Sequence, residues 1–327
     1  MSLPEVSVLS LGGTISSTNT GGPGVTPNLT GEALVEAVPE IPTYANVSAA
    51  SLRRVPGSDV TIEATVEVAR EARRLLDGGA AGVVVTQGTD SIEETAFVLD
   101  LLAGGEGPVV VTGAMRNPTL PGADGPANLL AAVQVAANPE ARGLGALVVF
   151  NDEIHAASLV RKTHTQSPAT FSSWPLGPVG YVAENRVRVV LRPERRWRVD
   201  LDSVDGEGRV AILTASMGDD GGLIPAVREA GYAGLVVEAL GGGHVPSPWV
   251  EPLAALAAQM PVVLASRTGG GEVLRETYSF PGSEMDLAGR GLIPSGSLDG
   301  RKARLLLTLL LRSGAGAEEI SSAFQSR

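Results

Sequence analysis

The 327-residue sequence has no cysteine, only three histidines, and only two lysines among its 25 basic residues. Without cysteine, disulfides, thiolate nucleophiles and cysteine-ligated zinc are all excluded. The three histidines, His155, His164 and His244, are too few and too scattered along the chain to predict a metal site. Their scarcity also argues against the Ser–His and Cys–His pairs that activate many enzyme nucleophiles.

Long apolar runs are missing as well. No stretch approaches the roughly 20 residues that a membrane-spanning helix needs. The first ten residues, MSLPEVSVLS, lack the basic start and the apolar centre of a signal peptide. The net charge of −11 argues against a nucleic-acid groove. We therefore expect a soluble cytoplasmic protein with neither a membrane nor a nucleic acid as its partner.

Lys162 and Lys302 stand out because the chain otherwise uses arginine for positive charge. Arginine stays protonated in proteins, whereas lysine can lose its proton and then act as a base. Lys302, in DGRKARLLL, starts an amphipathic helix and is expected to extend its amine along that helix into solvent. Lys162, in SLVRKTHT, is therefore the stronger candidate for chemistry.

The first part of the chain alternates apolar runs with helical patterns. The predicted strands are Val6–Leu11, Gly82–Thr86, Val109–Thr112 and Ala146–Phe150, and the predicted helices between them are Thr61–Leu76, Ile92–Leu102 and Pro126–Ala136. This alternation predicts right-handed βαβ units, and hence a mainly parallel sheet flanked by helices on both faces. A hairpin-like pair is expected around Ser158–His164 and Val179–Val190.

The alternation stops in the charged, turn-rich segment 191–208, which we interpret as a connector between two domains. Its basic cluster, Arg192, Arg195, Arg196 and Arg198, is expected to be solvated. The alternation then resumes with strands Val210–Ser216, Gly234–Ala239 and Val262–Ser266 and helices near Ile224–Ala230, Val250–Gln259 and Lys302–Leu311. The predicted fold class is therefore α/β, with a larger N-terminal domain at residues 1–190 and a smaller α/β domain at residues 209–327.

Two of the predicted strands end in a Gly-Thr pair. VSVLSLGGTISST ends its strand at Gly13-Thr14, and VVVTQGTDSIEET ends its strand at Gly88-Thr89. In open α/β sheets, ligands bind beyond the carboxyl ends of the strands. Glycine allows a sharp turn and a close approach of backbone to a ligand, so the two threonines are predicted to line a crevice.

These features also have plain structural interpretations. Asp90 followed by Glu93 is typical of a helix start with a capping box, and Asp124 before Gly125-Pro126 is typical of another helix start. The pair Gly12-Gly13 is compatible with a nucleotide-binding loop, but neither G-x-G-x-x-G nor G-x-x-x-x-G-K-[ST] is present.

A threonine hydroxyl becomes an effective nucleophile only when a neighbouring base takes its proton. A lysine that is held neutral in a desolvated site and oriented by a carboxylate can take that role. A Thr–Lys–Asp relay would therefore satisfy the chemistry, with Lys162 as the candidate base. The sequence alone does not place Lys162 beside Thr89.

Four stretches together resemble the bacterial-type L-asparaginases: LGGTISS, TQGTDSIEETAFVLDLL, VTGAMRNPTLPGADGPANLLAAVQVA and RKTHT. The resemblance extends over nearly the full chain and includes GSLDGRKARLLL near its end. Members of this family have a larger N-terminal and a smaller C-terminal α/β domain, and they hydrolyse the side-chain amide of asparagine to aspartate and ammonia. The resemblance thus implies an amidohydrolase that needs no metal and no other cofactor.

The resemblance also implies roles for individual residues. Thr14 is the nucleophile of the first motif, and Thr89, Asp90 and Lys162 form a second catalytic constellation. The implied substrate contacts are Ser58 and Thr89 to the α-carboxylate, Asp59 and Asp90 to the ammonium, the Gly88 backbone beside the substrate, and the Ala114 backbone at the amide being cleaved.

Three positions depart from the family's pattern. The loop after the first motif, TNTGGPGVTPNLT, has Gly24 or Val25 where the best-known members carry a tyrosine that activates the threonine. Another group or a water must then activate Thr14. Asp59 stands where many members have glutamine, and His244 stands near a position that is often asparagine.

The sequence therefore predicts an L-asparaginase with a threonine acyl-enzyme and a minor glutaminase activity. One alternative is an amidotransferase subunit that supplies ammonia to a misacylated tRNA, although such chains carry an extra N-terminal domain that we do not expect here. The other alternative is a non-catalytic amino-acid-binding protein, but the intact residues Thr14, Thr89, Asp90 and Lys162 argue against it. A homodimer or homotetramer is expected, because the family places an acid from a neighbouring subunit in each site and Glu284, in YSFPGSEMDLAGRGLIPSG, matches that position.

Overall fold

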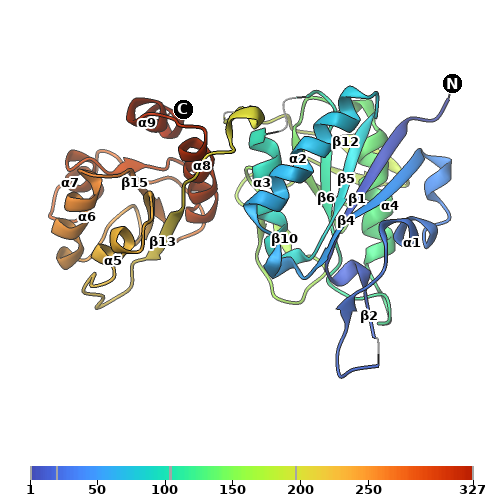
Figure 1. Ribbon diagram of the computed structural model, residues 1–327, viewed down its shortest axis with the longest axis horizontal. Coiled ribbons are helices and arrows are strands. Elements are labelled where there is room, and N and C mark those ends of the chain that lie inside the picture. The colour runs from blue at the N-terminus through green and yellow to red at the C-terminus, as the bar shows by residue number, and fades with distance from the viewer. Residues whose placement is uncertain (1, 20, 103–104, 196, 326–327) are drawn as a thin grey trace. The chain divides into compact units, whose positions relative to one another are not determined.

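The computed structural model describes residues 2–19, 21–102, 105–195 and 197–325. The chain divides into two compact units, a larger one at Met1–Leu201 and a smaller one at Asp202–Arg327. Each unit has its own sheet and its own helices (Figure 1). This architecture confirms the predicted α/β class, with a larger N-terminal and a smaller C-terminal part.

The larger unit is built on an eight-stranded sheet in the order β12-β11-β8-β7-β6-β5-β1-β4. Its strands are β1 (Glu5–Gly12), β4 (Asn46–Val55), β5 (Gly82–Thr86), β6 (Val109–Thr112), β7 (Ala146–Phe150), β8 (Glu153–Ala156), β11 (Gly180–Ala183) and β12 (Arg186–Val189). The strands from β7 to β4 run parallel, and β8, β11 and β12 continue the sheet antiparallel. β5, β6 and β7 are buried along their whole length, as strands with helices on both faces must be.

Helices cover both faces of this sheet (Figure 1). α2 (Ile62–Asp77) and α3 (Ile92–Leu102) pack on one face, and α1 (Gly31–Glu36) and α4 (Gly125–Ala137) pack on the other. The core on the second face joins Leu129 and Val133 of α4 to Val8 and Val84 of the sheet. α3 is buried on almost every side, and its buried residues include the acid Glu93. Such a residue is unusual, because acidic side chains are rarely buried unless they are paired.

The predicted strands of the first part are confirmed as β1, β5, β6 and β7, but the predicted hairpin is wrong. Residues 158–164 contribute β9 (Arg161–Lys162), which pairs with β10 (Phe171–Ser172), whereas β11 pairs with β12 and β8. The cause is a two-residue turn after β11, where Glu184 and Asn185 have φ angles of 49° and 60°. Such a turn folds a strand back onto its immediate successor.

The smaller unit is a parallel four-stranded sheet in the order β13-β14-β15-β16, with helices around it. Its elements are β13 (Val210–Thr214), α5 (Ile224–Glu229), β14 (Gly234–Ala239), α6 (Val250–Ala257), β15 (Val262–Ser266), α7 (Glu284–Gly289), β16 (Ile293–Pro294), α8 (Gly300–Arg312) and α9 (Ala317–Gln325).

The expectation that Lys302 extends into solvent is wrong. Its side chain is 3% exposed and lies 3.7 Å from the carboxylate of Asp299, because it occupies the buried side of α8.

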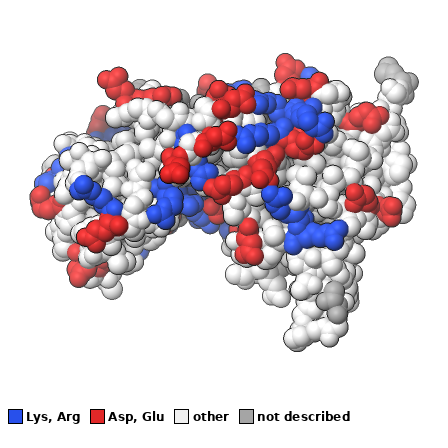
Figure 2. All heavy atoms as spheres, viewed as in Figure 1, with Lys and Arg blue, Asp and Glu red and all other residues white. Residues whose placement is uncertain are grey.

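The surface carries charges of both signs. On the face drawn in Figure 2, acidic and basic side chains are interspersed, without a continuous basic groove. Surface pairs such as Arg74 and Glu71, 2.6 Å apart on α2, contribute little to stability because water and salt screen them. Over the described ranges, no helix is both long enough and apolar enough to cross a membrane.

A buried ion pair attaches the last part of the larger unit to α3. Arg195 Nε lies 2.9 Å from Asp100 Oδ1, and the two side chains are 8% and 10% exposed. Burial raises the pKa of the Asp100 carboxyl, while the Arg195 guanidinium and the N–H of Ala146 favour its ionised form. The expectation of a solvated basic cluster is therefore wrong for Arg195, and Arg196 lies outside the described residues.

Replacing Arg195 with methionine should lower the free energy of unfolding by about 3–5 kcal/mol, because the Asp100 carboxylate would be left buried without its cation. The double variant Asp100→Asn/Arg195→Met should recover part of this loss. The measurement is denaturant-induced unfolding at neutral pH. The control is Arg186→Met on the exposed surface of β12, which should change stability by less than about 0.5 kcal/mol. A loss in Arg195→Met no larger than the control's would contradict the assignment.

Candidate active site

Four of the predicted site residues in the larger unit follow the carboxyl ends of its parallel strands, which form one edge of the sheet. Thr14 begins the 3-10 helix η1 (Thr14–Ser16) directly after β1, and Thr89 begins η4 (Thr89–Ser91) after β5. Ser58 lies in η3 (Gly57–Asp59) after β4, and Ala114 follows β6. Because β6, β5, β1 and β4 are parallel neighbours, their carboxyl ends meet at the same edge.

Three glycines bring these loops into direct backbone contact. A Cβ atom built on Gly13 would lie 2.0 Å from the nitrogen of Gly88, and one built on Gly88 would lie 2.5 Å from the nitrogen of Gly57. Gly13 also has a φ of 81°, in the left-handed region that favours glycine. No side chain fits between the loops, so the backbones that carry Thr14 and Thr89 touch.

Lys162 comes from β9 and lies against the start of η4. Its Nζ is 2.9 Å from Thr89 Oγ1 and 2.8 Å from Asp90 Oδ1. Thr89 is buried, whereas the Asp90 side chain is 68% exposed. A pair so exposed contributes only about 0–1 kcal/mol to stability. Its significance is geometric, because it holds an amine against a threonine hydroxyl as the predicted relay requires.

Local hydrogen bonds shape the turn that carries Thr14. The hydroxyls of Ser16 and Ser17 donate to the carbonyl of Gly13, at 3.0 and 2.8 Å. Thr14 itself is half-buried, and its hydroxyl has no hydrogen-bond partner within the part of the chain that the structure describes. The turn is therefore held by Ser16 and Ser17 and does not depend on the Thr14 hydroxyl.

Asp124 shapes the loop that carries Ala114. It precedes α4 as the sequence predicts, but its carboxylate makes no capping bond to that helix. It accepts the N–H groups of Met115, at 3.0 Å, and Arg116, at 2.8 Å. Asn128 donates to the main chain just before Ala114, also at 3.0 Å. The simple helix-start interpretation therefore misses the main contacts of Asp124.

Ser91 holds the loop that carries Ser58 and Asp59. Its hydroxyl donates to the carbonyl of Gly57 at 2.7 Å and accepts from the amide of Gln87 at 3.2 Å. Ser58 and Asp59 are exposed and lie 3.2 Å apart, so both remain accessible to a small molecule. The sequence contains no pattern that distinguishes Ser91 or Gln87 as supporting residues.

Asp90 and Glu93 both reach Lys162. Asp90 contacts the amine, and the Glu93 carboxylate accepts the backbone N–H of Lys162. A capping box at the start of α3 does not account for these contacts. The available signal was that Glu93 and Asp100 are acids on a helix that is otherwise almost entirely apolar on its buried faces.

The loop after Thr14 forms a small hairpin of β2 (Ser17–Thr18) and β3 (Thr26–Pro27), closed by a 2.9 Å contact between Thr18 Oγ1 and Asn28 Oδ1. Gly24 and Val25 are exposed within it. The loop contains no tyrosine, so activation of Thr14 cannot come from a phenol on this segment.

Glu284 and His244 lie in the smaller unit and contact each other. His244 Nε2 is 3.2 Å from Glu284 Oε2, and Glu284 Oε1 accepts the N–H groups of Thr277 and Tyr278 at 2.9 and 2.7 Å. Burial raises the pKa of Glu284, but these hydrogen bonds outweigh it and hold the pKa below its usual value. The described residues include no group of three His, Asp or Glu side chains that could hold a metal ion.

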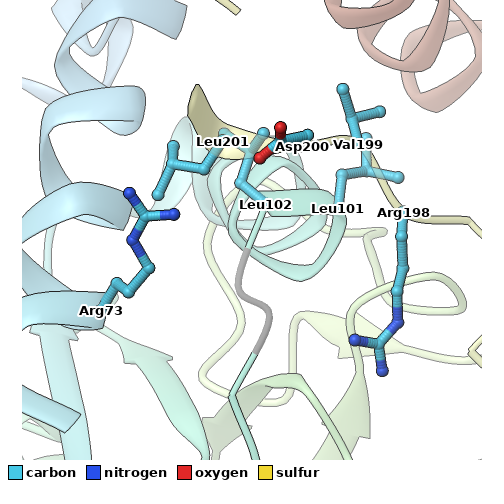
Figure 3. Close-up of a pocket in the computed structure, with 7 residues that line it drawn as sticks. All are labelled: Arg73, Leu101, Leu102, Arg198, Val199, Asp200 and Leu201. Atoms are coloured by element: carbon cyan, nitrogen blue, oxygen red, sulfur yellow. The ribbon is translucent and has the colours of Figure 1, made fainter. Parts of the chain in front are cut away.

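A cavity of about 260 Å³ lies in a different part of the larger unit (Figure 3). Its lining residues are Arg73, Leu101, Leu102, Arg198, Val199, Asp200 and Leu201. Arg73 and Arg198 lie on opposite sides of it and do not point toward each other. The cavity thus lacks convergent cations for an anion, and it includes none of the residues gathered at the strand ends.

Comparison with known proteins identifies relatives over the whole chain. A family model described as "Asparaginase, N-terminal" matches residues 5–195, and one described as "Glutaminase/Asparaginase C-terminal domain" matches residues 209–324. A probable L-asparaginase from Deinococcus radiodurans is 40% identical over 99% of this chain and 98% of its own length. L-asparaginase 2 from Bacillus subtilis is 34% identical over 98% of this chain and 86% of its own length.

The fold also matches a solved structure. The crystal structure of a probable cytoplasmic L-asparaginase from Campylobacter jejuni superposes with a TM-score of 0.88 at 30% identity, covering 99% of this chain and all of that chain.

Gly88→Ala should disrupt the site although the backbone conformation of Gly88, with φ −68°, is open to alanine. The added methyl would press on the Gly57 backbone, and such overpacking costs about 1–3 kcal/mol. The measurement is the thermal unfolding midpoint, together with a crystal structure to show whether the two loops separate. Gly289→Ala, where a Cβ meets no atom within 4 Å, is the matched control. Equal midpoints for the two variants would contradict the packing argument.

Proposed function

The chain belongs to the asparaginase family, and we propose that it hydrolyses the side-chain amide of L-asparagine to L-aspartate and ammonia through an acyl-enzyme on Thr14. The observation that carries this proposal is the contact of Lys162 with Thr89 and Asp90, next to the backbone contact of Gly13 with Gly88. It supports a site with two threonines, one lysine and one carboxylate at a single sheet edge.

In the first half of the reaction, the Thr14 hydroxyl attacks the amide carbon of the substrate. Its proton passes to the leaving nitrogen, so that ammonia departs and an aspartyl ester of Thr14 remains. Backbone N–H groups at the strand ends stabilise the oxyanion, and losing one such donor typically costs about 3–4 kcal/mol. With no tyrosine in the neighbouring loop, a water or another polar group carries the proton.

In the second half, water attacks the ester and regenerates the Thr14 hydroxyl. Lys162 and Asp90 organise the protons around Thr89 and around this water, because the amine touches both the hydroxyl and the carboxylate. A lysine suits this role because it can release its proton, whereas arginine cannot.

Binding of the substrate depends on its α-substituents. We assign Ser58 and Thr89 to the α-carboxylate, and Asp59 and Asp90 to the α-ammonium, with the Gly88 backbone alongside. The exposed carboxylates of Asp59 and Asp90 at the same edge support this assignment, because they favour a cationic group there. The Ala114 loop, held by Asp124, presents its backbone to the amide. A minor glutaminase activity fits the same chemistry.

Assembly and location complete the proposal. We propose a homodimer or homotetramer in the cytoplasm in which Glu284 of one subunit contributes to the site of another. Next to Glu284, the aromatic side chains of Tyr278 and Phe280, at 44% and 47% exposure and with ring centroids 5.8 Å apart, give a partner subunit an apolar surface to pack against. The hydrogen-bond partners of Glu284 in its own unit order the segment 277–284, which would be presented to the neighbouring subunit.

The amidotransferase alternative finds no support in the relatives, which are named as asparaginases.

The purified protein should release ammonia from L-asparagine without any partner or added metal. Thr14→Ala and Thr89→Ala should each abolish most of this turnover, because each removes a hydroxyl that the proposed reaction uses. Both variants should stay folded, because each also loses only one methyl group. Thr43→Ala, at an exposed position of the 3-10 helix Ile41–Thr43, is the control for threonine loss. Absence of turnover in the wild type would refute the proposed function, and full turnover in either site variant would remove that threonine from the mechanism.

Lys162→Arg should lower kcat by about 100-fold or more, although the positive charge is kept, because the guanidinium cannot exchange its proton in the relay. Steady-state ammonia release measures this effect. Arg161→Lys, the reverse exchange at the preceding residue of β9, should keep most of the turnover. If Lys162→Arg retains the wild-type kcat, Lys162 acts only as a fixed positive charge.

A further inference from the structure

Glu93 is a buried acid in the middle of the catalytic machinery, with no part in the mechanism described so far. Its residue surface is 3% exposed, and its neighbours along α3 are largely apolar. Burying a carboxylate is costly unless hydrogen bonds compensate it. The Glu93 carboxylate accepts the backbone N–H of Lys162, so one of its contacts is to the residue that bears the catalytic amine.

Lys162 needs such an anchor because its strand is short. Among the described residues, β9 has two residues and pairs with the two residues of β10, outside the large sheet, and the N–H groups of Thr163 and His164 extend this contact to Thr170. A flexible four-carbon side chain on a mobile backbone would lose its place beside Thr89. The hydrogen bond that the Lys162 N–H donates to Glu93 holds the Lys162 backbone on α3, and those that its amine donates to Thr89 and Asp90 hold the amine.

Residues 89–93 thus hold both the backbone and the side-chain amine of Lys162 from one short segment. η4 spans Thr89–Ser91 and α3 begins at Ile92, so the two amine contacts and the backbone contact come from consecutive turns of the chain. Any shift of this segment moves all three contacts together, which preserves their spacing.

The strand that pairs with β9 is fixed independently of Glu93. Phe171 of β10 packs against Phe150 of the large sheet with ring centroids 4.9 Å apart. Ser173, just after β10, lies 2.9 Å from Nδ1 of the buried His155. Loss of the Glu93 contact should therefore loosen Lys162 without unfolding this region.

We propose that Glu93 is a positioning residue that places the Lys162 amine against Thr89 and Asp90 by holding the Lys162 backbone. The inference rests on the proposed function, since its readout is turnover of asparagine. What matters is the reach of the Glu93 carboxylate oxygen Oε2 to the Lys162 N–H, and not the negative charge.

Two conservative variants separate reach from charge. Glu93→Gln keeps the length and an acceptor oxygen, and should keep kcat within about threefold of wild type. Glu93→Asp keeps the charge but is one methylene shorter, and should lower kcat by about 10- to 100-fold, because small displacements of catalytic groups are costly. KM for asparagine should change by less than about threefold in both, since the substrate contacts remain.

The matched pair Glu94→Gln and Glu94→Asp, one residue along the same helix, should keep the wild-type kcat. In a Lys162→Met background, Glu93→Asp should cause no further loss, because Glu93 acts through the lysine. Circular dichroism measures the folded fraction of each variant, and each kcat is calculated per folded protein.

Several results would overturn the inference while leaving the function intact: a wild-type kcat in Glu93→Asp, a collapse of kcat in Glu93→Gln with Glu93→Asp active, or a further loss in the Lys162→Met background. A wild-type protein that releases no ammonia from asparagine would instead refute the proposed function, so the two failures are distinguishable.

Discussion

The site depends on the contact of three glycine backbones at the carboxyl edge of the larger sheet. Gly88 touches both Gly13 and Gly57, so the loops after β5, β1 and β4 meet without side chains between them. Hydrophobic burial assembles the sheet, but it is non-directional and does not by itself set the distances between loops. Backbone contact does set them, and each of these glycines is followed directly by a residue with an assigned role at the substrate.

The lysine is the component that this arrangement does not supply. Parallel strands deliver Thr14, Ser58, Thr89 and Ala114 to one edge by topology alone, whereas Lys162 arrives on a two-residue strand outside the large sheet. Its position therefore relies on polar contacts with the segment that begins at Thr89. The structure thus combines a rigid part, built from apolar strands and glycines, with a lysine held by hydrogen bonds.

Much of the fold could be predicted from the sequence because β1, β5, β6 and β7 are continuous apolar runs with helical patterns between them. The edge strand β4 escaped prediction, since NVSAASLRRV is half-exposed and lacks such a run. The placement of Thr14 and Thr89 at strand ends follows from the same pattern. The contact of Lys162 with Thr89, 73 residues apart, does not, because it depends on how the chain returns. Arg195 and Lys302 were expected in solvent because charge alone does not reveal a buried counter-charge.

The central claim is that Thr14, at the glycine contact, carries the acyl group, and trapping that intermediate tests it most directly. The protein would be mixed with asparagine, quenched in acid during turnover, digested, and analysed by mass spectrometry for an added aspartyl group. The account predicts the group on the peptide that contains Thr14 and its absence from the peptide that contains Thr89. An aspartyl group on Thr89, with Thr14 unmodified, would contradict the account.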